Sequence, residues 1–489
     1  MAIHAVDVAV LAAYLSGVVL FGLWLGRGQR DVSDYLLGGR NLPWWGVLLS
    51  IVATETSTVT FLSVPGIAFD PQHGSLCFLQ LTFGYVLGRL LVVRLFLPLY
   101  FRGQLFTAYE VLHHRFGGVT KQTASLLFLL TRTLADGLRL YLTAIVLRHV
   151  AGLDLSMCIA VIGITTILYT FLGGMKSVVW NDCVQFAVYM AGGALALGLL
   201  AAKLPGGWSQ LAEFAAANGK LRLLDFSFDP SQKYTFWAGL VGGTFLSLAT
   251  HGADQLMVQR YLAARSQREA GRALALSGLV VCGQFALFLL IGVGLACFYS
   301  LNPPQVPFAK NDQVFAAFIV DHLPIGVVGV LLAAVFSAAM STLSGSLNSS
   351  ATAAVNDFYL PWRKEKPEAR HLLRVSRGLT VLFGLMQIGV GIAGQHLTES
   401  VVDGVLAIAG FATGPILGVF FLGILPRRIP QVAALAGLLG GLGLLVAVWS
   451  CTPLAWPWFA VLGASTTFAV GLVAAELLPA PNSNVDEPD

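Results

Sequence analysis

The chain has 489 residues, of which 56% are hydrophobic and 11% are charged, and its mean hydropathy is +0.76. Soluble domains carry about 25% charged residues, so this composition excludes an ordinary soluble protein and indicates an integral membrane protein. The formal net charge of +4 does not point to a nucleic-acid partner, because the basic residues gather in the loops between apolar runs. We expect a lipid bilayer and a small solute as partners, and no nucleic acid.

Thirteen apolar runs are long enough to cross about 30 Å of hydrocarbon. An odd number of spans leaves the two ends of the chain on opposite sides of the membrane. Lysine and arginine are concentrated in the loops of one side, Arg260 among them, and the positive-inside rule makes that side cytoplasmic. We expect a plasma (inner) membrane protein with its N-terminus outside and its C-terminus in the cytoplasm. The runs are residues 5–25, 43–66, 74–100, 121–148, 156–174, 178–203, 235–256, 271–300, 324–355, 372–394, 402–424, 431–450 and 454–477.

The first run has no basic stretch before its apolar core, so we expect a retained helix rather than a cleaved signal peptide. The second run is interrupted by "SIVATETSTVTF", residues 50–61, where Glu55 lies among threonines and serines. Hydroxyl and β-branched side chains compete with helical hydrogen bonds. Irregular backbone at membrane depth is tolerated only where it lines a cavity. An interrupted span of this kind indicates a transporter binding site.

Charged residues also occur inside later runs. In the fourth run, "LLTRTLADGLRLY" places Arg132, Asp136 and Arg139 on one helical face, and in the sixth run "VVWNDCVQ" carries Asp182. A charge at the bilayer centre costs about 2.5–3.5 kcal/mol on the insertion scale, so each of these residues needs a partner inside the protein. The two arginines can bind the carboxylate of a solute or form a structural ion pair with Asp136. The residues alone leave both interpretations open.

The ninth run contains "FSAAMSTLSGSLNSSATAAV", residues 336–355, which is unusually polar for a membrane span. Its polar side chains share one helical face, because steps of three and four residues return to the same side of a helix. Such a row can pack against neighbouring helices or supply ligands to an ion. Its members are Ser337, Ser341, Ser344, Asn348 and Thr352.

Five segments of the chain resemble the sodium/solute symporter family, which includes the sodium–glucose, sodium–proline, sodium–iodide and sialic acid carriers. The resemblance covers residues 30–425, and the segments occur in the order that the family has. They are "DYLLGGRNLPWW" before the second run, "TAYEVLHHRFG" after the third, "YTFLGGMKSVVWNDCVQ" across the fifth and sixth, "ADQLMVQRYLAA" after the seventh, and "SAAMSTLSGSLNSSATAAVNDFY" in the ninth.

The resemblance implies an all-α integral membrane protein with 13 transmembrane helices and a LeuT-like fold. Such a fold consists of two inverted repeats of five helices, and the first helix of each repeat is broken, here near residues 53–58 and at "ATHGAD", residues 249–254. We therefore expect an N-terminal accessory helix (1–30), a first repeat (40–203), an outer loop (204–234), a second repeat (235–425), two accessory helices (426–477) and a disordered cytoplasmic tail (478–489).

The resemblance also implies a site for Na+, the coupling ion, between the broken helix of the first repeat and the ninth run. Its ligands would be the carbonyl oxygens of Ala53, Thr56 and Ala338 and the hydroxyl groups of Ser341 and Thr342. Some members of the family hold a second sodium ion, and Asp182 and Ser344 match two of its ligands. The position of the remaining hydroxyl is Gly345 here, which is a departure from the family's pattern.

The solute is expected at mid-membrane beside the broken helix. An arginine there can bind a carboxylate through two hydrogen bonds, and the glutamine that sugar carriers keep is replaced by Ala407. Both features favour an organic anion, a sugar acid or a zwitterion over a neutral sugar or polyol, which stays as the alternative. The candidate solute-binding residues are Glu55, Ser57, Thr60, Gln80, Arg132, Arg139, Thr250 and His251.

These expectations together describe a monomeric sodium-coupled symporter that imports a small organic solute by alternating access. A channel would usually build its pore from rings of charges or carbonyls, whereas this chain has interrupted helices. An enzyme would need a nucleophile–base pair or a metal triad at depth, and no such set of residues is present in the sequence. A membrane sensor would carry a signalling module, for which the short C-terminal tail leaves no room. We therefore expect a transporter and not an enzyme.

Overall fold

The computed structural model describes residues 4–27, 29, 31–103, 105–151, 153–304, 307–308, 310–365, 367–396 and 401–478, with the backbone alone for residues 59, 146, 149–151 and 401–411. Within these residues every regular element is a helix, and one isolated β-bridge joins Leu42 to Ala264. The all-α prediction is therefore confirmed. The side chain of residue 407 lies outside the described part, as does the predicted tail apart from Leu478.

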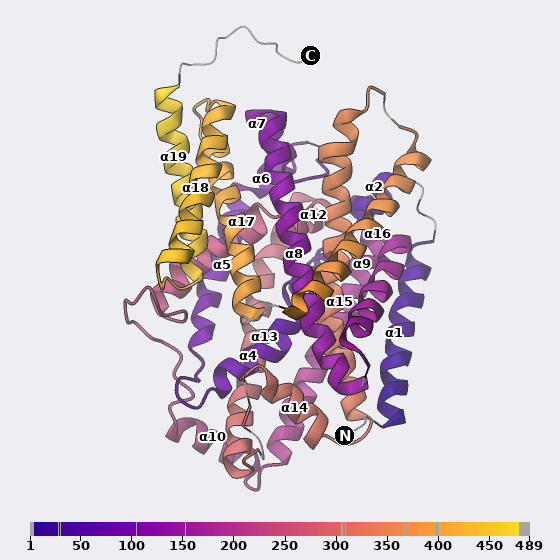
Figure 1. The fold of residues 1–489 in the computed structure, drawn as a ribbon, viewed down its shortest axis with the longest axis vertical. Coiled ribbons are helices and arrows are strands. Elements are labelled where there is room, and N and C mark those ends of the chain that lie inside the picture. Colours follow the sequence, from indigo (N-terminus) through magenta and orange to yellow (C-terminus); the bar gives the residue numbers. More distant parts are fainter. Residues whose placement is uncertain are drawn as a thin grey trace.

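The helices pack into one bundle, which Figure 1 shows with its longest axis vertical. Their bounds are α1 Ala5–Leu25, α2 Val32–Leu37, α3 Trp44–Glu55, α4 Thr58–Phe69, α5 Gln80–Leu95, α6 Leu97–Tyr100, α7 Glu110–Phe116, α8 Gly118–Ala151, α9 Leu155–Ala202, α10 Gly207–Ala217, α11 Gly243–Gly252 (preceded by a π-helical turn, Ala238–Gly242), α12 Gln255–Leu262, α13 Gln267–Leu301, α14 Gln313–His322, α15 Val327–Ala353, α16 Ala369–Ala393, α17 Val401–Ile424, α18 Gln431–Cys451 and α19 Pro457–Leu477.

The polar helix α15 occupies the centre of the bundle. Each of its residues from Leu331 to Ala353 is buried, and it packs against α1, α3, α8, α9 and α16. By contrast α1 lies at the periphery, and α17, α18 and α19 pack together on the other side of the bundle (Figure 1). A helix that is buried all round must satisfy its polar side chains within the protein.

Eight of the described helices are long and apolar enough to cross a membrane, or nine if the bent pair α3 and α4 is one span. The number of thirteen spans stays a prediction. The predicted fifth and sixth runs both lie in α9, whose 48 residues form two helices that meet at a kink. Its backbone leaves the helical conformation only at Gly174, between the predicted fifth and sixth runs.

Two helices are broken where the sequence predicts. Helix α3 ends at Glu55, Thr56 and Ser57 are extended, and α4 leaves at an angle of 60°. Helix α11 ends at Gly252, and the chain turns at Ala253 and Asp254 before α12 begins. The carbonyl groups at the end of a helix have no partner inside it, so each break exposes polar backbone in the middle of the bundle.

The ends of the described chain lie at opposite ends of the bundle. The start of α1 lies at the same end of the bundle as α10 and α14, and α19 finishes at the opposite end, where α7 also lies (Figure 1). This arrangement agrees with an odd number of spans, and which end faces the cytoplasm stays a prediction from the loop charges.

At Gly174 we expect that the addition of a single methyl group strongly lowers the stability of the protein. Its φ of 56° and ψ of −162° belong to a region that only glycine populates, and a Cβ there would lie 2.5 Å from the carbonyl oxygen of Tyr35. We expect Gly174→Ala to lower the free energy of unfolding by about 1–3 kcal/mol.

The measurement is thermal unfolding of the purified protein in one detergent. Gly198→Ala is the matched control, because Gly198 lies on the same helix with open space around its missing Cβ. Alanine favours a helix more than glycine does, so Gly198→Ala should leave the unfolding temperature equal or higher. Equal losses in the two variants would contradict the argument.

Candidate functional site

The break between α3 and α4 faces the hydroxyl groups of α15. The Ser341 hydroxyl donates to the carbonyl oxygen of Ala53 at 2.8 Å and lies 3.1 Å from that of Ala338. The Thr342 hydroxyl donates to the carbonyl oxygen of Thr54 at 2.9 Å and lies 3.4 Å from that of Thr56. All six residues are buried. We call these four carbonyl oxygens and two hydroxyl groups the oxygen cluster.

The oxygen cluster has more acceptors than protons. Two hydroxyl groups can donate two hydrogen bonds, whereas four carbonyl oxygens lie within 3.4 Å of them. The five residues that the family resemblance implied for sodium are therefore together at one point, joined by Thr54, which sequence reasoning missed. A group of neutral oxygen atoms with spare lone pairs can accept a small hard cation.

The remaining members of the polar row on α15 have other neighbours. Ser337 donates to the Tyr14 hydroxyl of α1 at 2.5 Å, and Ser344 donates to the carbonyl oxygen of Ser341 at 3.2 Å. The Gln259 amide of α12 donates to Asn348 at 2.7 Å and to Thr352 at 2.8 Å. The row is thus partly packing and partly directed at the broken helix.

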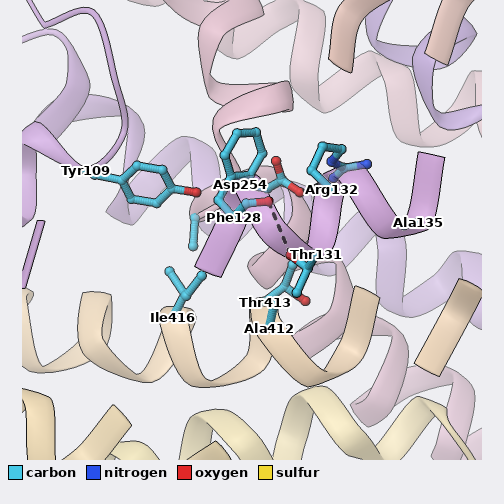
Figure 2. Close-up of a pocket in the computed structure, with 10 residues that line it drawn as sticks. Tyr109, Phe128, Thr131, Arg132, Ala135, Asp254, Ala412, Thr413 and Ile416 are labelled. Carbon is cyan, nitrogen blue, oxygen red and sulfur yellow. Dashed lines mark hydrogen bonds and ion pairs between the residues drawn. The ribbon is translucent and has the colours of Figure 1, made fainter. Parts of the chain in front are cut away.

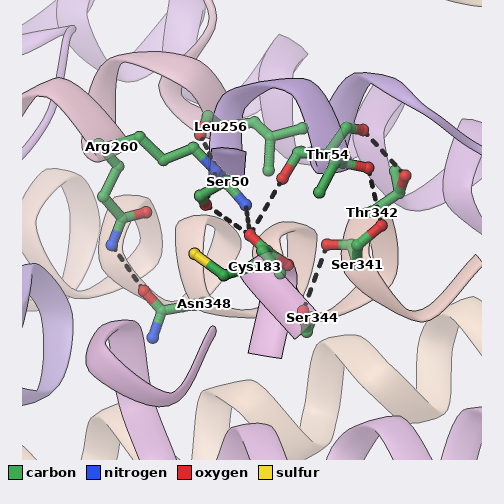
Figure 3. Close-up of polar contacts among 12 residues, drawn as sticks. Ser50, Thr54, Cys183, Leu256, Arg260, Ser341, Thr342, Ser344 and Asn348 are labelled. Carbon is green, nitrogen blue, oxygen red and sulfur yellow. Dashed lines mark hydrogen bonds and ion pairs between the residues drawn. The ribbon is translucent and has the colours of Figure 1, made fainter. Parts of the chain in front are cut away.

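Asp182 of α9 lies next to the oxygen cluster. Its Oδ2 accepts hydrogen bonds from Ser50 at 2.5 Å and from Thr54 at 3.4 Å, and it lies 3.1 Å from Nη2 of Arg260. Both charged side chains are at most 1% exposed. The sequence analysis counted Arg260 among the basic loop residues, and this placement is wrong, because Arg260 is buried in α12. Figure 3 shows the Arg260 side chain next to Ser50, with Thr54 between it and the hydroxyl groups of Ser341 and Thr342.

A central cavity of about 190 Å³ adjoins the broken helices. Aromatic and aliphatic side chains form much of its wall, Phe78, Tyr85, Phe285 and Trp456 among them. Six of the eight residues proposed to bind solute line it, namely Glu55, Ser57, Thr60, Arg132, Arg139 and Thr250.

The other two proposed residues do not line this cavity. The Gln80 amide donates to the carbonyl oxygens of Cys77 and Tyr234, each at 3.1 Å, and accepts from the backbone of Asp225 at 2.9 Å. Gln80, in α5, therefore holds the segment around Asp225 and Tyr234 against that helix. His251 lies behind the wall, with Nε2 at 3.3 Å from Oε1 of Glu55.

The charged groups around the cavity form ion pairs. Nη1 of Arg139 is 2.8 Å from Oδ1 of Asp136, and Nη1 of Arg132 is 3.7 Å from the same oxygen. Arg132 also forms a close pair with Asp254, the N-cap residue of α12, and Arg89 forms a close pair with Glu55. If His251 is neutral, the network has no net charge. It consists of three arginines and three carboxylates: Arg89, Arg132, Arg139, Glu55, Asp136 and Asp254.

Sequence reasoning missed Arg89 and Asp254 as members of this network. The available signal was their position: Arg89 interrupts the apolar run "GYVLGRLLVV", and Asp254 ends the broken segment "ATHGAD". A charge in an apolar run indicates an internal partner, although it does not say which residue that partner is.

A second cavity of about 20 Å³ lies beside Tyr109, the residue that precedes α7. Figure 2 shows its wall, where Tyr109 and Phe128 face Asp254 and Arg132. Arg132, Asp254 and Thr413 line both cavities. The ion pair of Arg132 and Asp254 therefore lies in the wall that the two cavities share.

Comparisons with known proteins agree with this geometry. A family model described as the sodium:solute symporter family matches residues 35–441. The chain is 34% identical to the sodium/iodide cotransporter of Homo sapiens over 459 residues, which cover 91% of this chain and 69% of that protein. It is 29% identical to the sodium-coupled monocarboxylate transporter 1 of Homo sapiens over 442 residues, which cover 89% of this chain and 72% of that protein.

Among solved structures, the chain is similar to a substrate-bound, outward-open Na+-coupled sialic acid symporter. The TM-score is 0.90 at 27% identity, and the match covers 97% of this chain and 98% of the other. The predicted LeuT-like fold is thereby confirmed, and the related proteins are transporters rather than enzymes. This multi-pass membrane protein is a sodium-coupled solute symporter and belongs to the sodium:solute symporter family.

Proposed function

We propose that this symporter imports a small organic anion with sodium by alternating access, across a plasma membrane in which its N-terminus is outside. The sodium ion would bind in the oxygen cluster and the solute in the central cavity. The proposal rests on one observation. The oxygen cluster, which has more hydrogen-bond acceptors than donors, lies beside a cavity around which the arginines and carboxylates are equal in number.

The chemistry of the oxygen cluster supports sodium as its ligand. Hard cations prefer oxygen ligands, and neutral carbonyl and hydroxyl oxygens hold an ion weakly enough for release. When sodium enters, the protons of Ser341 and Thr342 would turn away from the carbonyl groups, and the hydroxyl oxygens would face the ion. The ion would then join the broken end of α3 to α15 and stabilise one arrangement of the two helices.

The charge balance supports an anion as the solute. Sodium adds one positive charge to a cavity region that is neutral without it, and a monoanion restores neutrality in a low-dielectric environment. Arg139 is the side chain best placed to bind that anion, because it lines the cavity and is 20% exposed there, whereas its partner Asp136 is fully buried. Its guanidinium could bind a carboxylate through two hydrogen bonds.

The wall of the cavity supports a carboxylate with an apolar body. Much of the lining is aromatic or aliphatic, which suits a small monocarboxylate better than a solute with many hydroxyl groups. The relatives agree in charge, since iodide, monocarboxylates and sialic acid are all anions at neutral pH. We further propose that residues 40–203 and 235–425 form the two repeats, each headed by one of the broken helices.

The test is uptake into proteoliposomes under an imposed sodium gradient. Labelled pyruvate, sialic acid and iodide are compared with galactose, and sodium is replaced by choline in parallel. We expect sodium-dependent accumulation of pyruvate. Uptake of iodide, which is smaller, and of sialic acid, which is larger, shows the range of anion sizes that the cavity accepts. Accumulation of galactose alone, or equal uptake in choline, would contradict the proposal.

Arg139→Gln tests the site within the same assay. Loss of a charge-assisted hydrogen bond is worth about 1.5–3 kcal/mol, so the pyruvate concentration for half-maximal uptake should rise about tenfold or more. Arg94→Gln is the matched control, because Arg94 is an exposed arginine near the end of α5 that does not line the cavity. If both variants behave alike, Arg139 does not bind the solute.

A further inference from the structure

Asp182 has the surroundings of a cation ligand. It is fully buried, its Oδ2 accepts from Ser50 and Thr54, and its Oδ1 has no hydrogen-bond partner among the described residues. Thr54 connects it to the oxygen cluster, because the Thr54 carbonyl accepts from Thr342 while the Thr54 hydroxyl faces Asp182. A carboxylate at this depth needs a positive partner.

The positive partner in the structure is Arg260. Its Nη2 is 3.1 Å from Oδ2 of Asp182, its Nε donates to the Ser50 hydroxyl at 2.9 Å, and its Nη1 donates to the carbonyl oxygen of Leu256 at 2.7 Å. All three nitrogen atoms of the guanidinium thus have acceptors. Its position is held by α3, α9 and its own helix α12.

Gly345 provides the space for this guanidinium. A Cβ at position 345 would lie 2.4 Å from Nη2 and 3.1 Å from Nη1 of Arg260. The neighbouring positions Ser344 and Ser346 both carry hydroxyl groups, so the polar row on α15 lacks a side chain at the point where the arginine approaches.

We propose that the guanidinium of Arg260 is a fixed cation that occupies the Asp182 site in place of sodium, so that this chain binds one sodium ion per transport cycle. The inference rests on the proposed sodium site in the oxygen cluster and adds the stoichiometry. A sodium ion could approach Asp182 only at Oδ1, because the guanidinium of Arg260 lies against Oδ2. There it would lie next to a buried positive charge without a hydroxyl ligand from position 345, and two like charges so close in a low-dielectric interior repel each other strongly.

The experiment counts sodium ions bound to the purified full-length protein, with ²²Na+ as the probe and no solute present. We expect one ion per wild-type chain. Arg260→Gln removes the fixed cation while Asp182 keeps its charge, so this variant should bind two ions. Arg260→Gln/Asp182→Asn removes both charges and should bind one ion again.

The outcomes separate this inference from the proposed function. Two sodium ions on the wild-type chain, or one ion on a folded Arg260→Gln variant, would overturn the fixed-cation inference and leave the oxygen cluster as a sodium site. No sodium on the wild-type chain would instead overturn the proposed site in the oxygen cluster. If Arg260→Gln does not fold, the inference is tested by the number of sodium ions bound to the wild-type chain and to the Gly345→Ser variant. Since any side chain at position 345 must displace the guanidinium, we expect Gly345→Ser to bind two ions; a count of one would contradict the inference.

A second readout uses the membrane potential. One sodium ion with one monoanion moves no net charge, so uptake of an acid found in the proteoliposome assay should not respond to a potassium diffusion potential. Movement of one net charge through 100 mV would change accumulation about 50-fold. A response of that size would show more than one sodium ion per anion and would also overturn the inference.

Discussion

Replacement of Ser341 or Thr342 by alanine should raise the sodium concentration for half-maximal uptake about tenfold or more, and the double variant should lose sodium dependence. Each hydroxyl oxygen is a proposed ligand of the ion, and a hydrogen bond or ligand contact to a charged group is worth about 1.5–3 kcal/mol. A loss of 1.4 kcal/mol corresponds to about a factor of ten in affinity. The measurement is initial uptake rate against sodium concentration at constant ionic strength.

The same hydroxyl groups could simply satisfy the exposed carbonyl groups of α3, and a matched variant separates the two roles. Ser349 is also buried on α15, and among the described residues its hydroxyl donates to the carbonyl oxygen of Ser346 alone, at 3.0 Å. Ser349→Ala should leave the sodium dependence unchanged. A purely structural role predicts that Ser341→Ala lowers the unfolding temperature while sodium still stabilises the variant as it does the wild type. That result would remove the hydroxyl groups from the sodium site.

The second large effect is expected at the ion pair between Arg89 and Glu55. Arg89 is fully buried, and its Nε and Nη1 have no hydrogen-bond partner among the described residues. Glu55→Gln removes the carboxylate that compensates its charge. Breaking a buried pair from one side costs about 3–5 kcal/mol, so we expect a loss of that size in the free energy of unfolding, measured as a fall in the thermal unfolding temperature.

A double variant shows whether the unpaired charge is the cause. Glu55→Gln/Arg89→Met leaves no charge at the site and should recover most of the lost stability, because an apolar replacement of a buried pair is often neutral. Glu476→Gln serves as a control at an exposed pair, where Glu476 and Arg427 are 64% and 50% exposed, and should have no measurable effect. A double variant no more stable than Glu55→Gln would mean that packing, and not the charge of Arg89, dominates.

The breaks in the helices were predictable because their cause is local. Threonine and serine residues around Glu55 compete with the helical hydrogen bonds, and α3 ends at that residue. The turn at Ala253 and Asp254 follows a glycine, and Asp254 begins the next helix by accepting from the backbone of Leu256. These signals depend on residue type and spacing, which are read directly from the sequence.

The membrane location of the sodium symporter also followed from the sequence, because hydropathy depends on composition and the family's segments occur in order. The resemblance named residues of α3 and α15 that the structure brings within hydrogen-bond distance. Thr54 was missed because the resemblance implies carbonyl ligands only at Ala53, Thr56 and Ala338, and a further backbone oxygen facing Thr342 leaves no mark in the residue type.

The residue types and their positions were enough to predict that Glu55, Asp182 and Arg132 need partners inside the protein, because a lone charge is too costly in hydrocarbon. Their partners could be identified only in the folded chain: they are Arg89, Arg260 and Asp254, which lie 34, 78 and 122 residues away along the sequence. Such pairs form between helices that pack together, and their choice depends on crossing geometry and on small details such as the space above Gly345. Burial therefore makes a partner necessary, whereas packing selects which residue it is.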